Sequence, residues 1–437
     1  MDSSRKTGIA RAHIAAIALL AAGWGLARAR TATPTPLTES ETRDRDIVFY
    51  ERRAARDPQG AADRAQLAGL YLQRARARGG VADFRQAEAR ARQSLARRAG
   101  RNGKAQLVLA SSLLAQHRFI EARSAAEALV ALDSTQLGYR ALLGEIQLEL
   151  GDYDAARRTY AGLAPAWRQL AAAPRLARWA EIEGRTAEAR YILEAAVAAA
   201  RERRDLPVEQ VAWFHLRIAD LELRNGRLRA AERAVREGLV FVPNDPRLLA
   251  ARARIEAAWG RWRQAIRWGE RALAIAPDIA TLALVGDAWA ARGDSARGRA
   301  FWARADAAGP ANPEPFNRPW TLFLLDHGRR LPETRDLLSA EITARGDVYG
   351  WDQLAWALHL TGDHAAAESA MAQALRLGTR DAMLSFHAGR IALAVGDTVR
   401  ATRWLEDALR VNPSVYPFGS ITRALLDSLD RATIRGR

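Results

Sequence analysis

Glycine recurs along the 437-residue chain at a spacing that restricts the fold more than any other feature. Gly151 and Gly184 are 33 residues apart, and Gly226 and Gly260 are 34 apart. The residue five positions after each hinge glycine is always Ala or Gly. Glycine readily adopts the left-handed conformation that ends a helix, and a small residue lets two helices cross closely. The pattern therefore predicts antiparallel helix pairs that repeat about every 34 residues. The hinge glycines are Gly151, Gly184, Gly226, Gly260, Gly293, Gly362 and Gly396.

Proline marks the end of the second helix in several of these pairs. Pro243, Pro277 and Pro413 each stand 17 residues after their hinge glycine. Proline cannot continue a helix, so it separates one pair from the next. The composition agrees, because 49% of the residues are apolar, only 7% are aromatic, and the runs of Val and Thr that strands need are scarce. We therefore expect an all-α protein.

The repeat resembles the tetratricopeptide repeat family, in which the first helix carries an aromatic residue, Leu-Gly and Tyr, and the second carries Ala, an aromatic residue and Pro. The best copies are Arg140, Leu143-Gly144, Ala156 and Tyr160; Leu282, Val285-Gly286, Trp289 and Trp302; Trp351, Leu354-Ala355, Ala367, Met371 and Ala374; and Gly389, Ala401, Leu405, Ala408 and Pro413. The resemblance implies a right-handed superhelical solenoid of about ten pairs between residues 61 and 415. The expected starts are Ala61, Gly103, Leu137, Leu170, Ala212, Pro246, Ile279, Glu314, Val348 and Ala382.

The first 45 residues differ in composition from the repeats. Arg5 and Lys6 precede an apolar stretch at 12–26, and a small-residue site, Ala27-Arg28-Ala29, follows it. This order is typical of a signal peptide, so residues 1–29 are expected to be either cleaved or retained as a membrane anchor. Residues 30–45, rich in Thr and Pro, are expected to form a linker. We further expect a capping helix at 46–60 and a second capping helix with a tail at 416–437. The interpretation is an exported bacterial protein of the periplasm or cell envelope.

Charge is distributed unevenly along the chain. Lys and Arg number 66 against 50 Asp and Glu, and the segment 51–104 holds 14 basic residues against five acidic ones. A basic surface at this end could rest on an anionic membrane or envelope polymer. A solvated Arg-rich surface without a ligand is the alternative. Binding to nucleic acid is not expected, because no aromatic residues are interleaved with the basic ones. The arginines of this predicted surface are Arg74, Arg76, Arg78, Arg85, Arg90 and Arg92.

Motifs of catalysis and metal binding are missing from the sequence. The chain contains no Cys, and its seven His residues form no zinc-binding pattern. A phosphate-binding loop, a dinucleotide-binding glycine pattern and a nucleophile elbow are also absent. We therefore expect neither an enzyme nor a cofactor or metal site.

The resemblance implies an inner wall built from the first helix of each pair, at its second, fifth, ninth and twelfth positions. These positions give Trp213, Leu216 and Asp220 in the fifth pair, and a mixed aromatic and charged set in the last two pairs. Aromatic anchors with a few charges are typical of a peptide-binding surface. In the alternative interpretation, Trp356 and Phe386 only pack against neighbouring helices. The predicted partner-binding residues are Tyr349, Asp352, Trp356, His359, Phe386 and Arg390.

Taken together, these patterns favour a non-catalytic scaffold that binds partner proteins or peptides in the cell envelope. Binding of an anionic polymer or membrane through the Arg-rich N-terminal repeats is the alternative function.

Overall fold

The computed structural model describes residues 38–78, 80–311, 317–414 and 416–435. The predicted signal peptide or anchor at 1–29 lies outside the described residues. The chain consists of two units, residues 1–45 and 46–437. Within the described residues every regular element is helical, from α2 to α23, with one short 3-10 helix, η1 (Ala164–Ala166).

Helix α2 (Glu39–Arg56) begins inside the range predicted as a linker. The backbone NH of Glu41 donates to the Thr38 hydroxyl over 3.2 Å, and the backbone NH of Thr38 donates to the Glu41 carboxylate over 2.9 Å. This reciprocal pair is a capping box, which satisfies two NH groups that a helix start otherwise leaves unpaired. The box explains why the helix starts before residue 46.

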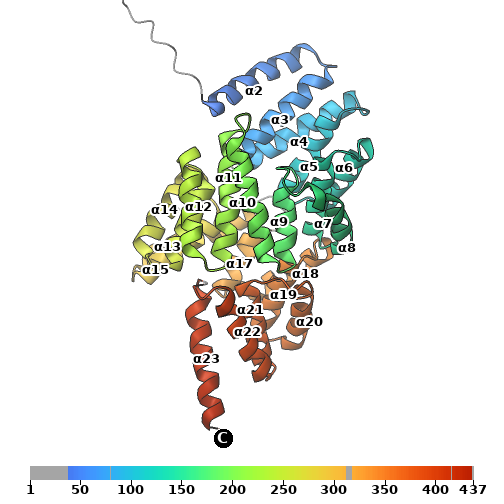
Figure 1. The fold of residues 1–437 in the computed structure, drawn as a ribbon. Helices are drawn as coiled ribbons and strands as arrows, with labels where there is room; N and C mark the ends of the chain where they lie inside the picture. Colours follow the sequence, from blue (N-terminus) through green and yellow to red (C-terminus); the bar gives the residue numbers. More distant parts are fainter. Residues whose placement is uncertain (1–37, 79, 312–316, 415, 436–437) are drawn as a thin grey trace, which may run out of the picture. The chain divides into compact units, whose positions relative to one another are not determined.

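Consecutive antiparallel pairs follow, so the predicted all-α fold of helix pairs is confirmed (Figure 1). The pairs are α3 (Ala61–Arg78) with α4 (Val81–Arg97), α5 (Gly103–Ala115) with α6 (Phe119–Leu132), α7 (Leu137–Leu150) with α8 (Tyr153–Leu163), α9 (Ala173–Ile182) with α10 (Thr186–Glu202), α11 (Val208–Arg224) with α12 (Leu228–Phe241), α13 (Pro246–Ala258) with α14 (Trp262–Ile275), α15 (Ile279–Ala291) with α16 (Ser295–Ala311), α17 (Arg318–Asp326) with α18 (Leu331–Ala344), α19 (Val348–Leu360) with α20 (His364–Ala374), and α21 (Ala382–Ala394) with α22 (Thr398–Val411). Helix α23 (Phe418–Arg435) ends the described chain.

The hinge glycines act as their spacing predicts. All seven have positive φ, from 69° at Gly226 to 90° at Gly362. After Gly151, the Asp152 side chain accepts a hydrogen bond from the backbone NH of Ala155 and caps α8. Ala156, five positions after Gly151, is fully buried where the two helices cross. The α5–α6 turn lacks such a glycine and uses His117 at φ 56°, which explains why the glycine period does not mark this pair.

First helices lie on the inner side of the solenoid. Successive first helices pack on one another, as α15 does on α13 and α17, whereas successive second helices have fewer contacts among the described residues. Elements that are closer together lie on the concave side of a curved stack of repeats. Side chains on the first helices therefore form the inner surface.

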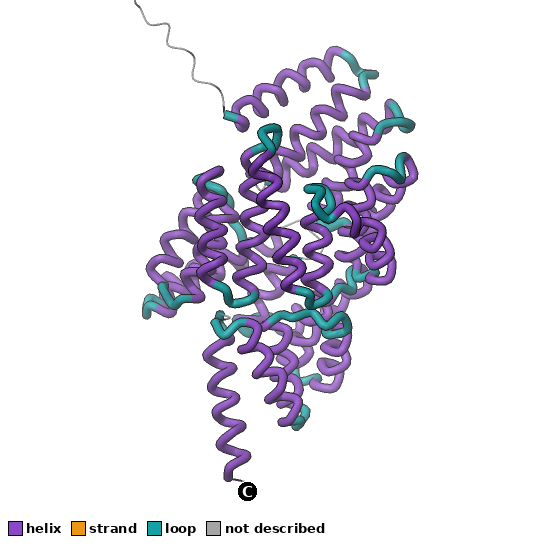
Figure 2. The backbone as a smooth tube through the Cα atoms, in the orientation of Figure 1, coloured by secondary structure: helices purple, strands orange, loops and turns teal. Residues whose placement is uncertain are grey.

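The solenoid returns to contact itself six pairs later. The turn at Gly151 meets Gly346, and the backbone NH of Gly346 donates to the carbonyl of Leu150 over 3.2 Å. The Asn412 side-chain amide donates to the carbonyl of Leu223 over 3.0 Å, beside Gly226. Figure 2 shows these connecting turns in teal between α7–α12 and α19–α22.

The C-terminal helix α23 covers the last pair. Phe418 at its start stacks on Phe386 of α21 with ring centroids 4.5 Å apart. None of the described helices is both long and apolar enough to span a membrane.

Candidate functional site

The structure brings five of the six predicted partner-binding residues together, all but Tyr349, and buries four of them. Asp352, Trp356 and His359 of α19 are at most 9% exposed, and Phe386 of α21 is 1% exposed. The Trp356 and Phe386 rings are 6.0 Å apart, and the guanidinium of Arg390 lies 6.0 Å from both. Arg390 is partly exposed. Tyr349, at the start of α19, is also partly exposed.

A histidine that sequence reasoning did not select, His387, explains this burial. Its ring is fully buried and stacks on Trp356 at 4.3 Å with an interplanar angle of 14°. Its Nδ1 lies 2.9 Å from an oxygen of Asp352. Trp356 and Phe386 thus pack against neighbouring helices, as in the alternative interpretation. Contact of these residues with a partner stays a prediction.

His359 shares this environment. Its ring stacks on Trp356 at 5.0 Å. Burial, followed by the nearby Arg390 and His364, lowers the pKa of His359 to about 4. The ring is therefore neutral near pH 7.

Charged side chains of α9 and α11 form a second cluster on the inner surface. Glu181 of α9 accepts from Arg178 over 3.0 Å and from Arg224 of α11 over 2.8 Å. The guanidinium of Arg178 lies 5.2 Å from the ring centroid of Tyr349, which brings the start of α19 to the same cluster. Burial acts to raise the pKa of Glu181, but Arg224 and Arg178 outweigh it and lower the pKa to about 2. Glu181 is therefore ionised, and its negative charge interacts with both Arg178 and Arg224.

The same cluster extends to α13. Arg254 of α13 lies 2.7 Å from the carboxylate of Asp220, which is partly exposed on α11. Burial acts to raise the pKa of Asp220, but Arg254 and Arg224 outweigh it and lower that pKa. We call Arg178, Glu181, Arg217, Asp220, Arg224 and Arg254 the inner charged strip.

Arg217 of the inner charged strip has no ion pair. Among the described residues no carboxylate lies within 4.0 Å of its guanidinium. Partial burial, followed by Arg224 and Arg178, lowers its pKa, whereas Asp220 and Glu181 act in the opposite direction. With four guanidinium groups against two carboxylates, the strip carries excess positive charge.

An acidic region lies on the inner surface of α15–α19. Asp326, at the end of α17, is exposed, and among the described residues it has no hydrogen-bonding partner. Partial removal of water from around this carboxylate raises its pKa; the nearby His387 and His327 act against this change, and Asp287 and Asp352 act in the same direction. The carboxylate of Asp287 already has two hydrogen-bonding partners, because Trp302 Nε1 and His327 Nε2 each lie 2.9 Å from it.

The six N-terminal arginines do not form one unpaired basic surface. Arg74 pairs with Asp83 at 2.7 Å, Arg90 with Glu51 at 2.9 Å, and Arg92 with Glu88 at 2.8 Å. Arg78 also has an interaction partner, and Arg85 is exposed. Arg76 is exposed as well. Binding of an anionic surface by these six stays a prediction.

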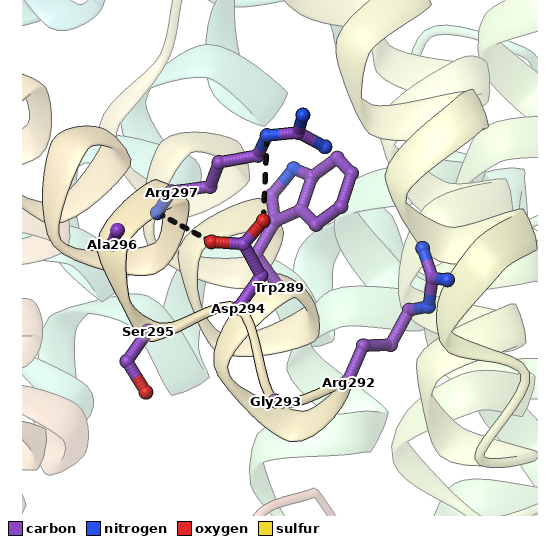
Figure 3. A pocket seen from close by; sticks show the side chains of 7 residues that line it. All are labelled: Trp289, Arg292, Gly293, Asp294, Ser295, Ala296 and Arg297. Atoms are coloured by element: carbon purple, nitrogen blue, oxygen red, sulfur yellow. Dashed lines mark hydrogen bonds and ion pairs between the residues drawn. The ribbon is translucent and has the colours of Figure 1, made fainter.

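A shallow hollow of about 650 Å³ lies at the α15–α16 hinge (Figure 3). Arg297 covers the ring of Trp289 at 4.5 Å, and its backbone NH donates to Asp294 over 3.0 Å. Within the described part of the chain no three His, Asp or Glu side chains are grouped to hold a metal ion. The hollow therefore presents the ring of Trp289, the guanidinium groups of Arg292 and Arg297, and the carboxylate of Asp294.

Comparison with known proteins gives no family assignment. No family model and no curated protein matches the chain. Similar solved structures include a tetratricopeptide repeat protein from Parabacteroides merdae (16% identity over 56% of this chain and 92% of that chain, TM-score 0.35). They also include yeast Tom70 (12% identity, 90% and 93%, TM-score 0.38) and the type IV pilus biogenesis factor PilW (17% identity, 58% and 96%, TM-score 0.33). TM-scores this low do not establish a shared overall arrangement, so the architecture rests on the chain's own helices and turns.

Proposed function

We propose that this protein is a non-catalytic scaffold that holds a partner protein on its inner surface. A stack of helix pairs presents an extended surface that suits binding rather than enclosure of a small substrate. The observation that carries the proposal is Arg217, a partly exposed arginine on the inner surface that lies near Arg224 and Arg178 and, among the described residues, has no carboxylate within 4.0 Å. A carboxylate of a partner would supply the ion pair that the chain itself does not.

The partner segment is an extended or helical peptide with at least one acidic side chain. It contacts Arg217, and its neighbouring residues contact the exposed parts of Tyr349 and Arg390. The buried set of Asp352, Trp356 and His387 supports this role indirectly, because its stacking and hydrogen bond hold α19 and α21 in one relative position. A rigid surface loses little conformational entropy on binding.

The cell envelope is the proposed location. The support is the order of charged, apolar and small residues in 1–29, which is typical of an export signal. A scaffold in this compartment would organise other exported or membrane proteins.

Affinity capture from envelope extract tests the proposal. The wild-type chain is compared with Arg217→Glu and with Arg158→Glu, which makes the same charge change at an exposed arginine of the second helix α8. A specific protein that the wild type and Arg158→Glu retain, and that Arg217→Glu loses, supports the proposal. Equal retention by both variants would remove Arg217 from the binding surface, and capture of no protein by the wild type would contradict the scaffold function.

A further inference from the structure

The exposed sides of α12 and α14 carry arginines in a repeated arrangement. Arg229 and Arg263 are 34 residues apart, as are Arg233 and Arg267, and this is also the distance between the hinge glycines Gly226 and Gly260. Equivalent positions of two successive second helices therefore hold arginine. We call the following six exposed residues the basic face: Arg229, Arg233, Arg236, Arg263, Arg267 and Arg271.

The two helices lie close together on one side of α13. Arg252 of α13 pairs with Glu232 of α12 at 2.6 Å. The same guanidinium lies 5.9 Å from the ring of Trp268 on α14. One side chain thus reaches both helices, so the arginines of α12 and α14 belong to one continuous surface.

The positive charges of the basic face are not neutralised by ion pairs. Among the described residues, none of its six arginines has a carboxylate within 4.0 Å. Of the acidic residues on these two helices, Glu232 pairs with Arg252, and Glu237 lies 3.8 Å from Arg201. Glu270 is the remaining one and is exposed. The N-terminal arginines, by contrast, are largely paired, so the basic face has the stronger attraction for an anion.

This arrangement is unfavourable for the isolated protein. Arg229 and Arg233 are four residues apart on one helix, as are Arg263 and Arg267, and like charges at this spacing destabilise a helix. An anionic surface would remove that repulsion. Its attraction for the arginines adds over the whole face and is screened by salt.

Apolar side chains adjoin the arginines. Val240, four residues after Arg236 on the same side of α12, is 76% exposed. Trp268 is partly exposed, and the guanidinium of Arg271 lies 4.8 Å from its ring centroid. Arginine combined with tryptophan and aliphatic residues is characteristic of helices that lie in the interface of a lipid bilayer. A hydrophilic polyanion would offer Val240 no favourable environment.

We propose that the basic face docks on an anionic lipid bilayer. The guanidinium groups contact lipid phosphates, while Val240 and the edge of Trp268 enter the headgroup region. Because this face belongs to second helices, it leaves the inner surface on the first helices free. The proposal does not depend on the identity of a protein partner.

Sedimentation with lipid vesicles tests this inference on the full chain. Binding to vesicles of phosphatidylcholine with 30% phosphatidylglycerol (about a third anionic lipid, in the range that attracts basic segments) is compared with binding to vesicles of pure phosphatidylcholine. The apolar 12–26 segment is present in both measurements, so the difference between them reports on the anionic lipid. The quadruple variant Arg229→Gln, Arg233→Gln, Arg263→Gln, Arg267→Gln is expected to lower partitioning into anionic vesicles at least about tenfold. The control makes the same charge change at exposed, ion-paired arginines: Arg157→Gln, Arg185→Gln, Arg400→Gln and Arg410→Gln.

A second pair of variants separates a bilayer from a soluble polyanion. Val240→Ser is expected to weaken vesicle binding about threefold or more, in line with the loss of an exposed aliphatic contact, without changing binding to heparin. Val399 of α22 is 71% exposed, close to the value for Val240. Val399→Ser is therefore the control and is expected to change neither vesicle binding nor heparin binding. Equal vesicle binding by the two quadruple variants would overturn the proposal. If the chain binds heparin more tightly than vesicles and Val240→Ser does not weaken vesicle binding, the ligand of the basic face would be a soluble polyanion and not a bilayer.

Discussion

The backbone NH of Val348 donates a 2.7 Å hydrogen bond to the hydroxyl oxygen of Tyr153, although the two residues are 195 positions apart. Tyr153 opens α8 and Val348 opens α19, and both are buried. The bond lies next to the contact between Gly151 and Gly346. Arg345 adds an ion pair with Glu149 at the same place. The third and ninth helix pairs are thus joined directly, which restricts how far the solenoid can open.

Removal of the Tyr153 hydroxyl is the simplest test of this joint. Tyr153→Phe leaves the buried NH of Val348 without an acceptor and is expected to cost about 1–3 kcal/mol of unfolding free energy. Tyr160→Phe is the control, because Tyr160 is also buried but its hydroxyl has no hydrogen-bonding partner among the described residues. Denaturant unfolding of both variants should show a loss for Tyr153→Phe only. Equal effects would mean that the bond does not stabilise the joint.

The close approach at Gly151 predicts unequal costs for the same substitution at two hinges. Gly151 and Gly260 have φ of 77° and 71°, so Ala at either position is strained by about 1–2 kcal/mol. A Cβ on Gly151 would also lie 2.3 Å from the carbonyl oxygen of Gly346, whereas a Cβ on Gly260 meets open space. Gly151→Ala should therefore cost a further ~1–3 kcal/mol. Thermal unfolding of the two variants measures the difference, and indistinguishable midpoints would argue against this contact.

Much of the repeat architecture could be predicted from the sequence, because it depends on local features. Helix pairs begin at Pro246 and Ile279, as expected from the glycine and proline spacing. The start at Val208 precedes the expected Ala212, since Pro207 begins α11 early. The contact between Tyr153 and Val348 could not be predicted, because it depends on small rotations that add up over six pairs.

The candidate site was harder to predict for the same kind of reason. Counting inner-wall positions from Ala212 selected Asp220 but not Arg217, which lies one helical turn earlier on the same side of α11. The burial of Trp356 depends on His387 of another helix. Spacing within one helix identifies the inner side, but exposure depends on what the next helix places there.

A buried ion-pair network beside the joint predicts a large loss for one arginine. Arg318 of α17 lies 2.6 Å from Glu341 and 2.7 Å from Asp347, and both carboxylates are buried. Burial opposes the charge of Arg318, but Asp347 and Glu341 outweigh it and raise its pKa. Arg345 also lies 3.0 Å from Asp347 and 3.9 Å from Glu341, but Arg318→Met removes the nearer cation from both buried carboxylates and should cost about 3 kcal/mol.

The matched control for Arg318 is Arg335→Met. Arg335 of α18 pairs with Asp336 at 2.8 Å, but both side chains are exposed. Exposed pairs contribute about 0–1 kcal/mol, so this variant should unfold nearly as the wild type does. Urea titrations of the two variants provide the comparison. A small loss for Arg318→Met would show that its two carboxylates find other partners.

Stability towards acid should depend on His359. The ordinary histidine pKa of 6.5 describes the unfolded chain, and burial lowers the pKa to about 4 in the folded protein. Between these pH values the unfolded chain binds a proton that the folded protein does not, so folding stability decreases as pH falls from 6.5 to 4. His359→Gln removes this contribution, which is at most about 3 kcal/mol. Denaturant unfolding at pH 7, 5.5 and 4 should therefore show a steeper decline for the wild type than for His359→Gln. Parallel declines would contradict the prediction, because all other titrating groups are common to the two proteins.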